Sequence, residues 1–192
     1  MCCSFYYTQK GIKKSIDELD PYMDEGFIFP DGKMGPGDRS LIVTGHNDRL
    51  SLAEATWGFP GKEGGLIINA RSETALAKPM FSSSVMYRRC AIPAECFFEW
   101  DYSKNMVSFT DPARTVMFLA GFWNIYENIM RFVVMTTAAN ESMVPVHDRM
   151  PLMIGLPDVR RWVLDNKGYQ QLLGIRMPLL DVYREQEQLS MF

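Results

Sequence analysis

Apolar positions along the chain occur mostly in short runs or in alternation with polar ones, a pattern typical of β-strands. Turn-forming residues separate these runs in the segment FPDGKMGPG at 29–37, the polar turn at 46–49 and the glycine-rich loop at 58–65. The pattern predicts strands at 41–44, 51–57, 66–70, 89–92, 96–100, 116–123, 132–137 and 152–154. So many short strands favour an antiparallel-rich fold.

Helical periodicity is confined to a few places. Ile12, Ile16 and Leu19 have the spacing i, i+4, i+7, which predicts a short amphipathic helix that ends before Pro21. The other predicted helical segments are 72–77, 157–164 and 169–173. No repeat or linker divides the chain, so we expect a single α+β domain. Its core should be an antiparallel-rich, partly closed β-barrel-like sheet with a few short helices, and the C-terminal helices at 157–192 should pack on it.

The composition is that of an ordinary globular protein. Of 192 residues, 47% are hydrophobic and 22% are charged, which excludes a disordered, collagen-like or coiled-coil chain. No apolar run approaches the roughly 18 residues that a membrane span requires. The formal net charge of −3 excludes a wholly basic surface, so nucleic-acid binding would need a local positive patch.

The cysteines suggest a reducing compartment rather than a disulfide or metal framework. They are Cys2, Cys3, Cys90 and Cys96. Their spacing does not match a CxxC zinc knuckle, and the chain has only two histidines, so we expect no metal and no cofactor. The start of the chain, MCCSFYYTQKG, lacks the apolar segment of a signal peptide, and a cytoplasmic protein is therefore expected.

Cys2 is the first candidate for covalent chemistry. A small second residue allows methionine aminopeptidase to remove Met1, which would make Cys2 the first residue of the mature chain. Such a cysteine carries both a thiol and a free α-amine with a pKa of about 7.7–8. The amine can form a Schiff base with an aldehyde, and the thiol can then close a five-membered thiazolidine ring. Considered alone, a Met-Cys start is a weak indication of this chemistry.

Three further segments carry polar residues that suit a catalytic site. Asn69 begins the segment NARSE, which follows a strand and opens a helix. Glu99 lies within CFFEW, where an apolar setting favours the protonated carboxyl group that general acid–base chemistry needs. His147 begins HDRMP, and an imidazole titrates near neutral pH. Taken singly, a helix cap, a buried ion pair and a surface histidine are the better explanations.

The ordered set of motifs is more specific than any one of them. After Cys2 come NARSE at 69–73, RRC-x-IPAE-x-FFEW at 88–100, G-x-W at 121–123, TTAAN at 136–140 and HDRMP at 147–151. Together they resemble the SOS-response-associated peptidase family, also called abasic-site processing proteins, from Cys2 to about residue 154. In that family the mature N-terminal cysteine captures the ring-opened aldehyde of an abasic site in single-stranded DNA, which gives a thiazolidine DNA–protein crosslink.

The resemblance implies a set of functional residues. The nucleophile falls on Cys2, and the other active-site residues are Asn69, Glu99 and His147. We expect Glu99 to exchange a proton with the sugar oxygen, His147 to bind a sugar hydroxyl or a phosphate, and Asn69 to hold the cysteine amine or the sugar. Arginine forks match phosphate and tryptophan rings stack on bases. The expected DNA contacts are Arg71, Arg89, Arg149, Pro36, Trp57 and Trp100.

The implied partner is single-stranded DNA that contains abasic sites. We expect a monomer without membrane association that lies at the nucleoid when it acts on DNA. The chain departs from the family at its start, where Cys3 and Ser4 replace the usual Gly-Arg and remove one expected DNA contact. The loop after Trp57 is short and lacks the further tryptophans often found there, whereas the PGD turn at 36–38 is family-like.

Two other functions remain open from the sequence. In the first, Cys2 as thiolate, His147 as base and Glu99 as orienting group would form a peptidase or amidase with an N-terminal nucleophile. In the second, the chain is a single-stranded DNA-binding module without chemistry. Intact mass distinguishes them, because only the crosslinking function requires loss of Met1 followed by a covalent adduct with abasic single-stranded DNA.

Overall fold

The structure is a computed structural model that describes residues 2–20, 22–23 and 28–184. The strands of these parts of the chain are β1 (Ser4–Tyr7), β2 (Gly32–Met34), β3 (Arg39–His46), β4 (Arg49–Trp57), β5 (Phe59–Pro60), β6 (Leu66–Ile67), β7 (Asn69–Arg71), β8 (Arg89–Ala94), β9 (Cys96–Trp100), β10 (Met106–Thr110), β11 (Met117–Tyr126), β12 (Ile129–Ala138), β13 (Arg149–Pro151), β14 (Met153–Ile154) and β15 (Asp181–Arg184). The α-helices are α1 (Gln9–Leu19), α2 (Pro79–Tyr87) and α3 (Val159–Leu164), and the 3₁₀ turns are Ala75–Ala77, Leu156–Asp158 and Tyr169–Gly174.

A closed five-stranded barrel forms the core of the molecule. Its strands follow one another in the order β12, β4, β3, β8, β11 and return to β12, and all neighbours are antiparallel except β4 and β12. The expected α+β fold with an antiparallel-rich, barrel-like core is confirmed. Closure depends on a close approach at Gly121, where an added Cβ would lie 2.8 Å from the carbonyl oxygen of Val133 on β12. Alanine at this position would therefore force the two backbones apart.

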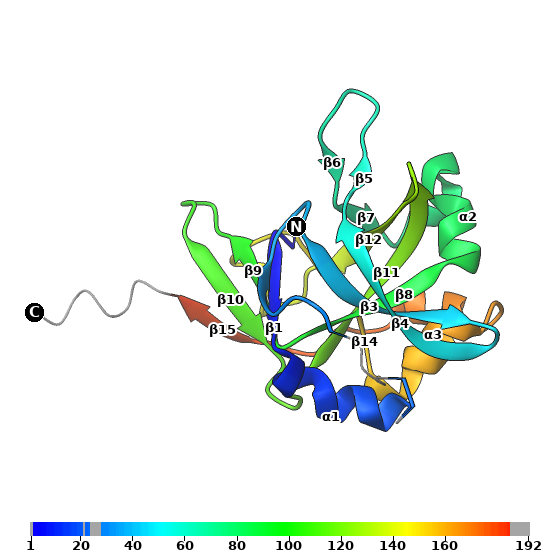
Figure 1. The fold of residues 1–192 in the computed structure, drawn as a ribbon. Coiled ribbons are helices and arrows are strands. Elements are labelled where there is room, and N and C mark those ends of the chain that lie inside the picture. Colours follow the sequence, from blue (N-terminus) through cyan, green and yellow to red (C-terminus); the bar gives the residue numbers. More distant parts are fainter. Residues whose placement is uncertain (1, 21, 24–27, 185–192) are drawn as a thin grey trace, which may run out of the picture.

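A second sheet covers one side of the barrel, and helices cover the other (Figure 1). The order of this sheet is β15-β10-β9-β1-β2, with β1 antiparallel to β9. The inner face of β1 packs on the barrel, because the Phe5 ring lies 5.1 Å from Trp57, and Trp57 stacks on Phe132 at 6.1 Å. On the opposite side, α2 lies against β8 and β11, and α3 lies against β8, β3 and β4. The chain end that carries Cys2 is thereby fixed to the rigid core.

Hydrogen bonds also hold the C-terminal end of β1, where the strand is followed by Thr8. Thr8 caps α1 by accepting a hydrogen bond from the Gly11 N–H at 2.9 Å, and its own N–H donates to the Glu95 carboxylate at 2.6 Å. Capping satisfies a donor that the first helical turn leaves unpaired. Since Glu95 joins β8 to β9, this contact holds the β1–α1 junction against the strands beside it.

Several elements differ from the sequence predictions. The helix α2 was not predicted, because its sequence PMFSSSVMY carries a run of serines and no clear amphipathic repeat. The segment predicted as a helix at 72–77 contains only the 3₁₀ turn Ala75–Ala77. The strands β2 and β5 lie in segments predicted as loops, and the strand predicted at 66–70 is divided into β6 and β7.

The C-terminal segment also differs from its prediction as helices at 157–192. It begins with α3 and the 3₁₀ turn Tyr169–Gly174, but Asp181–Arg184 forms β15 on the edge of the second sheet. Residues 185–192 and Pro21 lie outside the described residues. Among the described helices, none is both long enough and apolar enough to span a membrane.

Candidate functional site

Two strands from different sheets hold the backbone around Cys2. The Cys3 N–H donates to the carbonyl of Phe98 at 3.1 Å and extends the pairing of β1 with β9 by one residue. On the other side, the Asn69 amide Nδ2 donates to the carbonyl oxygen of Cys2 at 3.0 Å. Asn69 begins β7, which runs parallel to β12 of the barrel. The contact predicted for Asn69 was with the amine or the sugar, and the contact found is with the Cys2 carbonyl.

The thiol of Cys2 lies in an environment that favours its neutral form. The side chain is buried, and Sγ donates a weak hydrogen bond to the Ser4 carbonyl at 3.6 Å. Burial raises the pKa of the Cys2 thiol well above its ordinary value, and the nearby Cys3 and Glu99 raise it further. Cys2 is therefore a thiol rather than a thiolate at neutral pH, and a base must take its proton before sulfur can attack.

Glu99 lies on the buried face of β9. Its side chain is 3% exposed and shares that face with the buried Phe97 ring, as strand alternation predicts. One carboxylate oxygen accepts a hydrogen bond from the Trp100 N–H at 2.9 Å. Trp100 itself points to the opposite face and is 47% exposed. The carboxylate is close enough to Cys2 and Cys3 to raise the pKa of both thiols.

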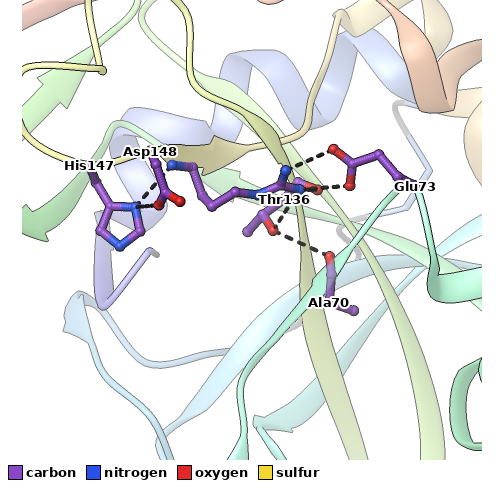
Figure 2. A network of polar contacts seen from close by, with 6 residues as sticks. Ala70, Glu73, Thr136, His147 and Asp148 are labelled. Atoms are coloured by element: carbon purple, nitrogen blue, oxygen red, sulfur yellow. Dashed lines mark hydrogen bonds and ion pairs between the residues drawn. The ribbon is translucent and has the colours of Figure 1, made fainter.

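His147 is joined to the Asn69 strand through Arg149 (Figure 2). The imidazole Nδ1 accepts a hydrogen bond from the Arg149 backbone N–H at 2.9 Å. The Arg149 guanidinium donates to both carboxylate oxygens of Glu73 at 2.8 Å and to the Thr136 carbonyl at 2.7 Å. The Thr136 hydroxyl in turn donates to the carbonyl of Ala70, the residue after Asn69. The structure thus brings Cys2, Asn69 and Glu99 together and connects His147 to them by this network.

Arg149 was predicted to contact a DNA phosphate, and in the structure it is paired with Glu73 instead. Its side chain is only 11% exposed, and the Glu73 carboxylate and the Thr136 carbonyl already use its fork. Sequence reasoning included Glu73 and Thr136 in the motifs NARSE and TTAAN but gave neither residue a role. Glu73 in NARSE and Arg149 in HDRMP belong to motifs of one site, and such a carboxylate and arginine are a signal for an ion pair. The sequence does not show which arginine pairs with Glu73.

Two further predicted DNA contacts are wrong because their side chains are buried. Arg89 is 1% exposed, and Trp57 has no exposed surface. The Trp57 indole N–H donates to the Ile68 carbonyl at 2.9 Å, and its ring packs between Phe5 and Phe132. Arg89 donates to carbonyls at the ends of α2 and α3. Of the predicted DNA contacts, Arg71, Pro36 and Trp100 are exposed.

One cavity lies away from Cys2. A cavity of about 780 Å³ is lined by residues such as Arg114, Met153 and Arg176, and none of the four predicted active-site residues lines it. Within the described residues, no cluster of three or more His, Cys, Asp or Glu side chains is arranged to hold a metal ion. The groups that the structure brings to the Cys2 thiol are the Asn69 amide and the Glu99 carboxylate.

A protein-family model described as SOS response associated peptidase (SRAP) matches residues 1–190, nearly the whole chain. The chain belongs to the SRAP family. Curated relatives include the abasic site processing protein YoqW of Bacillus subtilis, which is 28% identical over 160 residues, or 76% of this chain and 71% of the relative. The abasic site processing protein YedK of Escherichia coli is 27% identical over 180 residues, or 85% of this chain and 79% of the relative.

Solved structures show the same fold. A crystal structure of a protein from Bordetella bronchiseptica superposes with a TM-score of 0.78 at 20% identity, and the match covers 95% of this chain and 99% of that one. A phage-related protein from the same organism gives a TM-score of 0.77 at 20% identity, with 97% and 95% coverage. The SRAP fold is therefore retained at low sequence identity.

Proposed function

We propose that this SRAP chain captures the ring-opened aldehyde of an abasic site in single-stranded DNA as a thiazolidine on Cys2. The observation that carries the proposal is the convergence on Cys2 of the Asn69 amide and the buried Glu99 carboxylate. The curated relatives named abasic site processing proteins support it. The proposal requires removal of Met1, which lies outside the described residues.

The reaction balances with one water released. The α-amine of Cys2 adds to the aldehyde carbon and gives a carbinolamine, which loses water to form a C=N bond. The Cys2 sulfur then adds to the same carbon, and its proton ends on the nitrogen as the five-membered ring closes. Expulsion of water requires an acid, and attack by a neutral thiol requires a base.

Glu99 suits both proton transfers. In its protonated form it can donate to the deoxyribose ring oxygen during ring opening and to the departing hydroxyl group of the carbinolamine. As a carboxylate it can take the proton from the Cys2 thiol, whose raised pKa makes that step necessary. Asn69 holds the Cys2 carbonyl, so the amine and the thiol on the same residue keep a fixed orientation. His147 is proposed to bind a hydroxyl or a phosphate of the substrate.

The strand of DNA is proposed to pass over the exposed side chains near Cys2. Arg71 follows Asn69 by two residues on β7 and supplies a cation for phosphate. Trp100, with an exposed ring at the end of β9, supplies a surface on which a base can stack. Pro36 lies in the exposed turn after β2. The peptidase alternative needs the same proton transfer from the buried Cys2 thiol, with His147 in place of Glu99 as the base.

The covalent step is tested by comparing the two adjacent cysteines. Cys2→Ala should abolish crosslinking to abasic single-stranded DNA, because it removes the thiol that closes the ring. Cys3→Ala should keep most of the crosslinking, since Cys3 has no free α-amine. A denaturing gel with abasic and intact oligonucleotides measures both, and a tag placed before Cys2 should act like loss of the thiol. Equal crosslink yields from Cys2→Ala and the wild type would rule out the assignment.

The proton-transfer role is tested by Glu99→Gln, which keeps the shape of the side chain but cannot exchange a proton. We expect crosslink formation and reversal to slow by about 10²–10⁴-fold, the usual effect of general acid–base catalysis. Affinity for an intact strand should change little. Time courses of formation and reversal are compared with a thermal melt of each protein. Normal kinetics together with a lowered melting temperature would indicate a purely structural Glu99.

A further inference from the structure

The ion pair between Arg149 and Glu73 joins two segments that are far apart in the sequence. Glu73 follows β7, the strand of Asn69, and Arg149 begins β13, directly after His147 and Asp148. Both Nη atoms of Arg149 donate to the Glu73 carboxylate, and this interaction lowers the pKa of Glu73. A bidentate pair of this kind fixes direction as well as distance. The loop of His147 is thereby attached to the strand that holds Cys2.

The same residue also determines how the imidazole is oriented. A backbone N–H always carries its proton, so the 2.9 Å contact from the Arg149 N–H makes Nδ1 of His147 an acceptor. In the neutral imidazole the single proton must then be on Nε2. The arrangement gives His147 one tautomer, with an N–H donor at Nε2.

A second contact at Nδ1 competes with this assignment. The Asp148 carboxylate lies 2.8 Å from the same nitrogen, which is favourable only if Nδ1 carries a proton. We assign Nδ1 as the acceptor, because the Arg149 N–H cannot lose its proton and the Glu73 ion pair holds Arg149 in place. Asp148 is 74% exposed and can turn to water at little cost. Protonation of His147 would exchange the Arg149 N–H for the Asp148 carboxylate.

We propose that Arg149, anchored by Glu73 and the Thr136 carbonyl, is a positioning residue that holds His147 in the Nε2–H tautomer and directs it as a donor to the substrate. The catalytic consequence rests on the proposed function, whereas the tautomer does not. Arg149 thus acts on the substrate through His147. Because small displacements of a catalytic group are costly, loss of the anchor should slow crosslinking by about tenfold to a hundredfold.

Nitrogen-15 NMR of the imidazole rings reads the tautomer directly. The chain has only two histidines, and His46 on the exposed β3–β4 hairpin serves as an internal reference. In the wild type, His147 should be almost entirely the Nε2–H tautomer, and in Arg149→Ala and Glu73→Ala it should shift toward the mixture shown by His46. Glu73→Gln, which can still accept one hydrogen bond from Arg149, should give an intermediate shift and a smaller loss of crosslinking rate.

A matched control breaks a different ion pair. Arg39 and Glu54 form an exposed pair at 2.9 Å between β3 and β4, so Glu54→Ala should change neither the His147 tautomer nor the crosslinking rate. A wild-type His147 with its proton on Nδ1, or tautomers and rates within twofold of wild type in both alanine variants, would overturn the proposal. If the spectra behave as expected but the wild type forms no crosslink, the positioning role stands and the proposed function fails. Glu73→Gln covers the case in which an alanine variant does not fold.

Discussion

Arg89 is buried and Arg149 is largely buried, and both lie within family motifs, yet their partners differ in kind. Arg149 binds a carboxylate, Glu73, beside the candidate site. Arg89 binds neutral acceptors on the helical side of the barrel, and its guanidinium lies 4.2 Å from the Tyr169 ring. The acceptors of Arg89 are the carbonyl oxygens of Val85, Met86, Trp162 and Val163 and the side-chain oxygen of Asn166.

The comparison shows how one side chain supports either a fold or a site. The carbonyls at a helix C-terminus lack partners and carry partial negative charge, so a cation between two such ends stabilises both. Arg89 does this for α2 and α3 at once. Burial lowers its pKa, but an arginine stays protonated across the working pH range, so its bonds do not respond to pH. The partner of Arg149 is the titratable Glu73 carboxylate, so the hydrogen bonds of Arg149 can respond to pH.

The largest effect is expected where Arg89 is replaced. Arg89→Met keeps the length of the side chain but leaves several buried carbonyls without donors, and each of these costs about 1–3 kcal/mol. We expect the free energy of unfolding to fall by at least about 3 kcal/mol, with the denaturant slope unchanged. Urea unfolding measures it, with Arg39→Met as the exposed control that should lose less than about 1 kcal/mol. A loss for Arg89→Met as small as that of the control would show that the helix ends do not depend on the arginine.

A third arginine sharpens the contrast, because Arg71 is exposed and, within the described residues, acts on Glu73 through its charge without a hydrogen bond that anchors it. Arg71→Ala should weaken binding to single-stranded DNA by about 1–3 kcal/mol and reduce the salt dependence of the affinity by about one phosphate contact. Its unfolding curve should match that of the wild type. Fluorescence anisotropy at several salt concentrations measures the affinity. The control is Arg160→Ala on α3, the helix that packs on β8. Unchanged affinity at low salt would remove Arg71 from the DNA surface.

The sequence predicted the barrel strands better than the elements around them. Long alternating or apolar runs such as 132–137 became β12, since the barrel buries one face of every strand. The segment at 96–100 became β9 with its predicted bounds. In contrast, α2 and β15 depend on tertiary packing, on Arg89 in one case and on the edge of β10 in the other. A local pattern does not contain that information.

The residues of the site follow the same distinction. Family motifs named Cys2, Asn69, Glu99 and His147, and the structure places the first three in one arrangement. The motifs did not show that Arg89 faces two helix ends or that Arg149 is occupied by Glu73. An arginine looks the same in the sequence whether its partner is a phosphate, a carbonyl or a carboxylate. Only the packing around each guanidinium, which depends on distant parts of the chain, determines which partner it has.

The smallest predicted effect tests whether the two buried arginines differ in their response to pH. Hydrogen bonds from Arg149 lower the pKa of Glu73 below its ordinary value. A carboxyl group whose pKa is lowered by folding adds stability above its unfolded pKa of about 4.3, and that stability is lost as pH falls through the folded pKa.

The gap in melting temperature between the wild type and Glu73→Gln should therefore be full at pH 7, begin to shrink near pH 4 to 5, and close further below. Since Glu73 is 48% exposed, solvent screening should limit the gap to about 1–3 °C. The gap between the wild type and Arg89→Met should change less over the same range, because none of the Arg89 hydrogen-bond acceptors titrates there and the exposed Asp165 carboxylate interacts with Arg89 only through its charge. Melting curves of the three proteins from pH 7 to pH 3 measure both gaps. A Glu73→Gln gap that is constant or grows with acid would show that the carboxylate of Glu73 does not stabilise the loop of His147, and the two arginines would then differ in position alone.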